Sequence, residues 1–240
     1  MRRRWERVAG LRGHALVGGD GPPLVLVHGL AVSSRYFVPL ARRLAGRRSV
    51  LAPDLPGHGR SGTPPRALGI AGLADALLEW LDLAGIERAP LVANSLGCQV
   101  AVELAVRAPE RVERLVLVGP TMDPSAPTIA AQALRLARDV PREPLGLNLA
   151  EARDYLRTGP RRILATARAA LDDPFAEKLR RVRAPALVVR GGRDPIVSQA
   201  WAERVTELLP HARLAVVAGE PHAVHWSAPD AVARLVEEGE

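Results

Sequence analysis

Short apolar runs alternate with longer amphipathic stretches along most of this chain, and this alternation limits its fold more than any other feature. The apolar runs comprise residues 24–28, 49–52, 89–93, 114–118, 186–190 and 213–217. The stretches with helical spacing comprise residues 33–45, 70–83, 96–107, 201–209 and 229–237. Buried strands that alternate with helices form β-α-β units, in which the strands run parallel. The sequence therefore predicts an α/β fold with a mainly parallel central sheet flanked by helices.

One segment interrupts this alternation. Between Gly119 and Ala184 the sequence is helical, divided by prolines, and without a convincing strand. Its length is too great for a loop inside a compact domain. We therefore expect a core made of residues 1–120 and 184–240, with a helical cap insertion, residues 121–183, over one end of the sheet. The apolar underside of this insertion is expected to include Leu134, Leu136, Leu145, Leu147, Leu149, Tyr155, Leu156, Ile163 and Leu164.

The strongest local motif surrounds Ser95. The apolar run 89–93 leads directly into Asn94-Ser95, small residues stand at Ala93 and Gly97, and a helical pattern follows at once. A strand-to-helix turn this tight holds a serine hydroxyl out at the end of the sheet, next to a helix N-terminus that favours negative charge. The alternative is that Ser95 only caps the helix.

With this motif the chain resembles the α/β-hydrolase family, and the resemblance extends over essentially its whole length. It implies that Ser95 is a catalytic nucleophile, although Ala93 stands where the family usually has glycine. It also implies that His28-Gly29 marks the loop that forms half of the oxyanion hole. The oxyanion hole would then consist of the backbone N–H groups of Leu30 and Leu96.

The remaining two members of a catalytic triad are expected in the last third of the chain. Asp194 follows the run 186–190, and the resemblance makes it the triad acid, with Asp123 as the alternative. His222 fits the family's catalytic histidine, which precedes the final helix, with His225 as the alternative. The order Ser95, Asp194, His222 is the order that this family shows.

These residues together predict a serine hydrolase that works through an acyl-enzyme intermediate. The apolar insertion favours a carboxylesterase that acts on small or medium hydrophobic esters. A carbon–carbon bond hydrolase, a thioesterase and a lactonase share the fold and the triad, so they stay as alternatives. An alternative of another class is a non-catalytic small-molecule receptor.

The charge of the chain indicates no second function. The net charge is +7 and comes almost entirely from arginines that are scattered along the chain rather than interleaved with aromatic residues, so we expect no nucleic-acid partner. No apolar run approaches the roughly 20 residues of a membrane helix, so we expect no membrane insertion. No cofactor or metal motif is present, and we expect neither. A single cysteine, Cys98, and the lack of a recognisable signal peptide predict a cytoplasmic location.

Overall fold

The computed structural model describes residues 1–238 and contains one eight-stranded sheet, in the order β1-β2-β4-β3-β5-β6-β7-β8. Its strands are β1 (Arg2–Val8), β2 (Leu11–Gly18), β3 (Pro23–Val27), β4 (Ser49–Asp54), β5 (Ala89–Asn94), β6 (Val112–Val118), β7 (Ala186–Gly191) and β8 (Ala212–Val217). Strands β3 to β8 pair in parallel, and β2 runs antiparallel to both β1 and β4. The predicted α/β fold with a mainly parallel sheet is confirmed.

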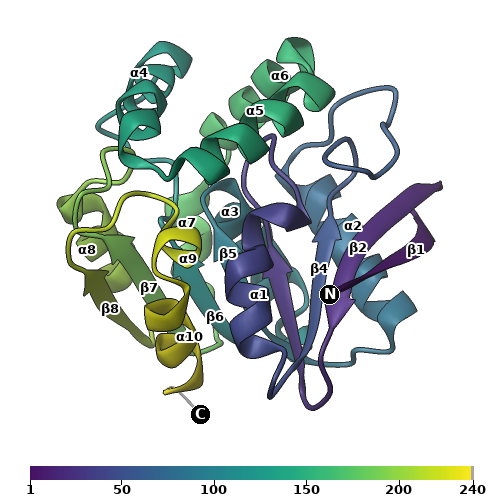
Figure 1. The fold of residues 1–240 in the computed structure, drawn as a ribbon. Helices are drawn as coiled ribbons and strands as arrows, with labels where there is room; N and C mark the ends of the chain where they lie inside the picture. The colour runs from purple at the N-terminus through teal and green to yellow at the C-terminus, as the bar shows by residue number, and fades with distance from the viewer. Residues whose placement is uncertain (239–240) are drawn as a thin grey trace.

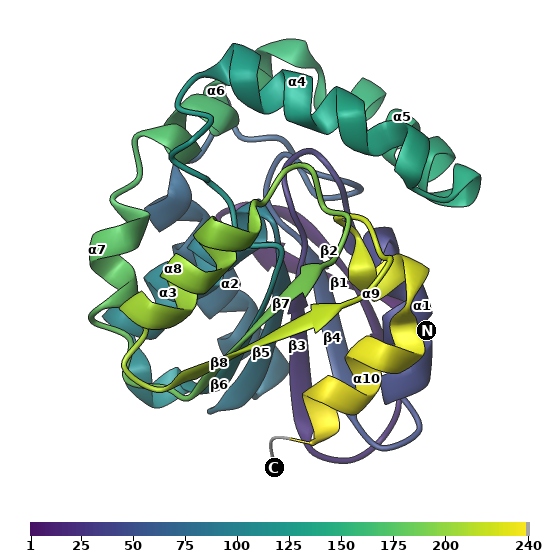
Figure 2. The ribbon, with the colours of Figure 1, turned by 90° about the vertical axis from the view of Figure 1, so that its left-hand side faces the viewer.

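Helices cover both faces of the sheet (Figures 1 and 2). On one face lie α2 (Ile70–Ala84), α3 (Leu96–Arg107) and α8 (Gln199–Leu208). On the other face, the 3-10 turn η1 (Ser34–Phe37) leads into α1 (Val38–Leu44), which packs with α9 (Val224–Ser227) and α10 (Pro229–Glu237). The strands between the two layers are buried on both faces, which is why they appear in the sequence as continuous apolar runs.

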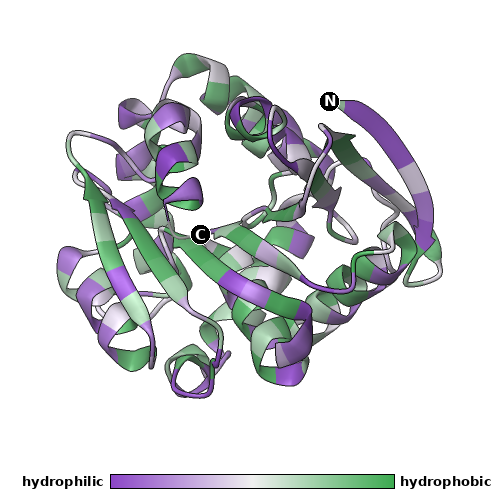
Figure 3. Cartoon of the chain, turned by 90° about the horizontal axis from the view of Figure 1, so that it is seen from below, coloured by the Kyte–Doolittle hydropathy of each residue, from purple (hydrophilic) through white to green (hydrophobic). Residues whose placement is uncertain are grey.

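The antiparallel hairpin β1–β2 has no counterpart among the predicted strands. Its two-residue turn, Ala9-Gly10, has positive φ values of 50° and 72°, as the commonest type of tight hairpin turn requires. Strand β1 forms one edge of the sheet, and the arginines at its exposed positions give it the hydrophilic colour near the N-terminus in Figure 3. Strand β8 forms the opposite edge, where Val216 is 46% exposed. The hairpin lacks a continuous apolar run because β1 is not covered on both faces.

Four helices lie between β6 and β7: α4 (Ile129–Asp139), α5 (Leu145–Thr158), α6 (Pro160–Leu171) and α7 (Phe175–Leu179), with the 3-10 turn η3 (Val140–Arg142) after α4. Helices α4 to α6, which we call the cap (residues 129–171), lie above the carboxyl ends of the strands (Figures 1 and 2). Helix α7 instead packs against α3, and its Phe175 and Leu179 are buried in the main core. The limits predicted for the insertion stay a prediction.

The predicted apolar underside of the cap is wrong for several of its members. Leu145, Leu149 and Leu156 are 74%, 65% and 85% exposed, and Leu134 on α4 is 53% exposed. On α5 these leucines occupy the outer face, because residues separated by about four or seven positions share one side of a helix. The opposite side turns Leu147 inward, together with the buried polar residues Asp154 and Thr158. The inner surface of the cap is therefore more polar than the sequence predicted.

No helix within the described chain combines the length and the apolar character that crossing a bilayer requires.

Candidate active site

Ser95 occupies a strained turn between β5 and α3. Its backbone has φ 57° and ψ −125°, a conformation that costs a non-glycine residue about 1–3 kcal/mol and is usually found at functional sites. The turn is tight, because a Cβ atom on Gly97 would lie 2.3 Å from the carbonyl oxygen of Val27. The Ser95 side chain makes no capping hydrogen bond to α3. This geometry fits a nucleophile better than a helix cap.

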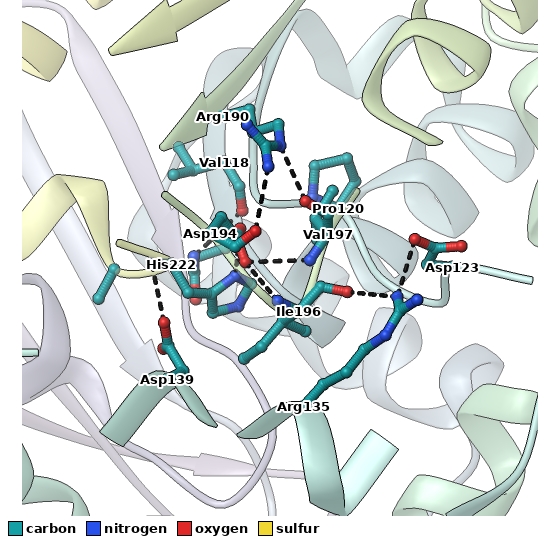
Figure 4. A network of polar contacts seen from close by, with 12 residues as sticks. Val118, Pro120, Asp123, Arg135, Asp139, Arg190, Asp194, Ile196, Val197 and His222 are labelled. Carbon is teal, nitrogen blue, oxygen red and sulfur yellow. Dashed lines mark hydrogen bonds and ion pairs between the residues drawn. The ribbon is translucent and has the colours of Figure 1, made fainter. Parts of the chain in front are cut away.

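His222 and Asp194 form a buried pair in the loops that follow β8 and β7. Nδ1 of His222 lies 2.7 Å from Oδ2 of Asp194 (Figure 4). The other oxygen of the carboxylate accepts the N–H groups of Ile196 and Val197 at 2.7 and 3.0 Å. Arg190 donates to the carbonyl oxygens of Asp194 and Val197 at 3.0 and 2.8 Å. The acid is therefore fixed by its own loop, and it in turn fixes the orientation of the imidazole.

Strand β6 brings this pair to the same edge as Ser95. The N–H of Ser95 donates to the carbonyl oxygen of Val118 at 3.0 Å. The next residue, Gly119, lies directly against the histidine: a Cβ atom there would be 2.7 Å from Cε1 and 2.8 Å from Nδ1 of His222. Nε2 of His222 is buried and has no hydrogen-bond partner among the described residues. The structure thus gathers all three predicted residues at the carboxyl ends of parallel strands.

The two predicted oxyanion donors belong to chain segments that border Ser95. Leu96 is the first residue of α3, and the first N–H groups of a helix have no acceptor within it. Gly29 lies close to the serine, since a Cβ atom on it would be 3.1 Å from Cβ of Ser95. Leu30 follows immediately, and then Ala31, whose φ of 61° is unusual for a non-glycine residue. The chain around residues 29–31 therefore bends sharply beside the serine.

The two alternative triad residues have other partners. Asp123 accepts hydrogen bonds from Arg135 at 2.8 Å and from the N–H of Ser198 at 3.1 Å, and Figure 4 shows it away from the Asp194–His222 pair. His225 is fully buried between Tyr36 and Phe37, with ring centroids 4.5 and 4.4 Å away. Asp123 therefore links the cap to the core, and His225 packs in an aromatic cluster with Tyr36 and Phe37.

A buried polar network supports the loop beside the serine. Nε2 of His28 accepts the N–H of Leu55 at 3.0 Å. Asp54 accepts the N–H of Ser34 at 2.7 Å and pairs with Nδ1 of His14 at 2.8 Å. Burial lowers the pKa of His28, so its neutral form is favoured. These buried hydrogen bonds fix the position of the chain from residue 28 to residue 34.

Comparison with known proteins agrees with this arrangement. A family model described as the alpha/beta hydrolase family matches residues 24–235. The chain belongs to this family.

An uncharacterised protein of Mycobacterium bovis is 36% identical to this chain over 115 residues, which are 48% of this chain and 34% of that protein. The match therefore spans about a third of that relative's length. The pimeloyl-acyl-carrier-protein methyl ester esterase of Aromatoleum aromaticum is 31% identical over 90% of this chain and 97% of its own. Among solved structures, the 2-hydroxy-6-oxo-6-phenylhexa-2,4-dienoate hydrolase of a Rhodococcus strain is similar, with 25% identity, a TM-score of 0.81, and coverage of 99% of this chain and 97% of that one.

The charges around His222 come from both the core and the cap. Burial would lower the pKa of His222, but the negative charges of Asp194, Asp139 and Glu143 outweigh it and raise the pKa to about 9. Burial raises the pKa of Glu143 to about 8 and that of Glu151 to about 7. Three cap carboxylates, those of Asp139, Glu143 and Glu151, thus interact electrostatically with the histidine. Within residues 1–238, no group of three or more His, Cys, Asp or Glu side chains is arranged to hold a metal ion.

The cap residues Asp139 and Glu143 were not predicted as members of the site. Asp139 accepts the N–H of His222 at 3.4 Å, and Glu143 accepts the N–H of Ala223 at 2.6 Å. The only sequence signal is that acidic residues are few in an arginine-rich segment. That pattern alone does not reveal which loop they contact.

Proposed function

We propose that this hydrolase is a serine esterase in which Ser95 is the nucleophile, His222 the general base and Asp194 the residue that orients the histidine. One observation carries the proposal: a serine held at a strained φ of 57° lies at the same strand ends as a buried His–Asp pair with a 2.7 Å contact. A nucleophile, an orienting acid and a base that follow three parallel strands, β5, β7 and β8, form the arrangement that acyl transfer needs.

The reaction would proceed in two stages. His222 removes the Ser95 proton while the serine oxygen attacks the substrate carbonyl, and the N–H groups of Leu30 and Leu96 stabilise the oxyanion. The leaving alcohol takes the proton from His222. Water then attacks the acyl-enzyme by the same route, which releases the acid and regenerates the serine. Asp194 stays ionised and stabilises the imidazolium in both stages.

The substrate proposed is a carboxylic ester with a small or medium acyl group. The similarity to an enzyme named a methyl ester esterase supports ester hydrolysis. A small apolar cluster of Val32, Tyr36, Leu147 and Ala223, between the cap and the histidine loop, supports an apolar acyl chain. The carboxylates of the inner cap surface favour substrates that also carry hydrogen-bond donors.

A second candidate is hydrolysis of a carbon–carbon bond. Its support is the similarity to a solved structure named a 2-hydroxy-6-oxo-6-phenylhexa-2,4-dienoate hydrolase. The same serine and histidine would serve, so the two candidates differ only in the substrate that the cap admits.

The test is hydrolysis of p-nitrophenyl esters of increasing acyl length, with Ser95→Ala beside the unaltered enzyme and a fluorophosphonate probe as a label. Turnover and labelling that both disappear in the variant support the esterase. Labelling of Ser95 without ester turnover favours the carbon–carbon hydrolase, which a vinylogous diketone would then assay. Neither labelling nor turnover would refute the catalytic proposal and favour a small-molecule receptor.

A further inference from the structure

The loop that carries His222 is attached to the cap through two buried carboxylates. Glu143 Oε1 accepts the N–H of Ala223 at 2.6 Å, and Asp139 Oδ1 accepts the N–H of His222 at 3.4 Å (Figure 4 for Asp139). Asp139 is the last residue of α4, and Glu143 directly follows η3 in the turn to α5. Asp139 and Glu143 are only 3% and 8% exposed. The position of the histidine loop thus depends directly on that of the cap.

Carboxylates are a costly choice for accepting two backbone N–H groups, because a neutral amide or hydroxyl would accept them without burying charge. Neither Asp139 nor Glu143 forms an ion pair with an arginine or lysine among the described residues. Oε2 of Glu143 is buried without a hydrogen-bond partner in the same part of the chain. The negative charge of this pair therefore has one nearby counterpart, the imidazole of His222, and Glu143, whose pKa is raised to about 8, carries its full charge only above that pH.

On the cap, acidic and basic side chains are separated by burial. Its acidic residues are all buried or half-buried, namely Asp139, Glu143, Glu151 and Asp154. Its exposed charged residues are all arginines, namely Arg138, Arg142, Arg153, Arg157, Arg161 and Arg168. If the acidic residues of the cap formed ion pairs with its arginines, residues of both charges would lie together on its surface. Here the negative charge is concentrated toward the catalytic edge of the sheet.

The cap also contacts the other two loops of the site. Arg135 on α4 donates to the carbonyl oxygen of Ile196, in the loop of Asp194, at 2.8 Å (Figure 4). Asp154 on α5 accepts the hydroxyl of Ser33, in the loop that follows Leu30. The cap is thus bonded to all three loops, and the contact to the histidine loop is the one that places carboxylates next to the catalytic imidazole.

From this geometry we infer that Glu143, assisted by Asp139, is a positioning residue that couples the seating of the cap to the assembly of the catalytic histidine. With the cap seated, the histidine loop is fixed and the imidazolium formed during acyl transfer faces negative charge. With the cap displaced, both effects are lost, so the catalytic base is complete only when the site is covered. The inference rests on the proposed role of His222 as general base.

The inference also predicts the direction in which the pKa of His222 changes when a cap carboxylate is removed. His222 faces Asp194 from its own side of the sheet, Asp139, Glu143 and Glu151 from the cap, and His225 from α9. The cap carboxylates help to raise the pKa of His222. Removing one of their charges lowers that pKa, so the acid limb of the kcat/KM profile moves to lower pH. A contact that is merely structural would leave this limb in place.

The experiment compares two substitutions at Glu143. Glu143→Gln keeps an oxygen that accepts the Ala223 N–H but removes the charge, whereas Glu143→Ala removes both. Glu177→Gln and Glu177→Ala on α7 are the matched controls, since Glu177 is exposed and has no side-chain partner in the described structure. For each variant, kcat, KM and fluorophosphonate labelling are measured from about pH 5 to 10, and the His222 imidazole is titrated by NMR.

We expect Glu143→Gln to move the acid limb and the NMR titration down by at least half a pH unit while the plateau kcat stays within about threefold. We expect Glu143→Ala to lower the plateau kcat and the labelling rate by about 10- to 100-fold, because the histidine loop is released. The inference is overturned if both variants match their Glu177 counterparts in kcat and in the NMR titration, or lose thermal stability alone. Absence of Ser95 labelling in the unaltered protein would instead count against the proposed function, while the NMR titration still tests the contact.

Discussion

Replacing Gly119 with alanine should separate the positioning of His222 from the stability of the fold. Gly119 has a φ of 55°, and an added Cβ atom would meet Cε1 and Nδ1 of His222 at 2.7 and 2.8 Å. Ordinary carbon contacts begin at about 3.5 Å, so the ring must move by roughly 0.7 Å. That movement strains the 2.7 Å contact with Asp194 and shifts the imidazole, including Nε2, from its position in the structure.

The expected cost has two parts. The left-handed backbone costs an alanine about 1–2 kcal/mol, which lowers Tm by roughly 2–8 °C in a chain of this size. Displacement of a catalytic group by somewhat less than an ångström lowers kcat/KM by as much as about 100-fold. The two costs are independent, so a suitable control can remove one of them.

Gly85→Ala is that control. Gly85 has a φ of 68° at the end of α2, and an added Cβ atom would meet nothing within 4 Å. Both variants should therefore lose similar thermal stability by calorimetry, but only Gly119→Ala should lose activity on a p-nitrophenyl ester and labelling of Ser95. Equal activity of the two variants would contradict the placement of His222 against Gly119.

Three further predictions concern the cap, the titrating cluster and the cysteine. The free energy of unfolding should fall as the pH rises through neutral, because the folded-state pKa of His222 is raised from 6.5 to about 9. The stabilisation that this shift provides, up to about 3 kcal/mol, is complete below pH 6.5 and is lost as the pH passes 9. Urea unfolding at several pH values measures it. The raised pKa of Glu143 acts in the same sense, so a flat profile would refute this reading of the cluster. Arg135→Ala should cost about 1–3 kcal/mol and speed proteolytic cleavage of the cap, because it leaves buried Asp123 without its ion pair, whereas the exposed Arg138→Ala should change neither. Cys98, on α3, is fully buried and burial raises its pKa, so a thiol reagent should modify it only at the rate of unfolding. Fast modification of the folded protein would show that α3 opens locally.

The site could be predicted where its residues follow buried strands. Ser95, Asp194 and His222 each come after an apolar run, and parallel strands bring their carboxyl ends to one edge. The alternation of apolar runs and helical stretches therefore predicts that these side chains lie at the same edge of the sheet. The choice between His222 and His225 needed the resemblance to a family, because both lie within a few residues of the same strand.

The cap residues could not be predicted in the same way. A helix such as α5 has leucines on one side and Leu147 with Asp154 on the other, and the spacing alone does not tell which side faces the sheet. That choice depends on contacts with chain segments more than 100 residues away, such as the bond from Ser33 to Asp154. Glu143 was missed for the same reason, since its partner Ala223 is 80 residues distant.

The two edges of the sheet have a consequence for how the protein behaves at high concentration. Unpaired strand edges are where separate copies of a chain join and aggregate. Copies that approach through β1 bring rows of arginines together and repel each other. Copies that approach through β8 meet only Arg213 among charged groups, beside the exposed Val216. Precipitation on warming should therefore begin at β8, and a lysine in place of Val216 should delay it without touching the residues around Ser95.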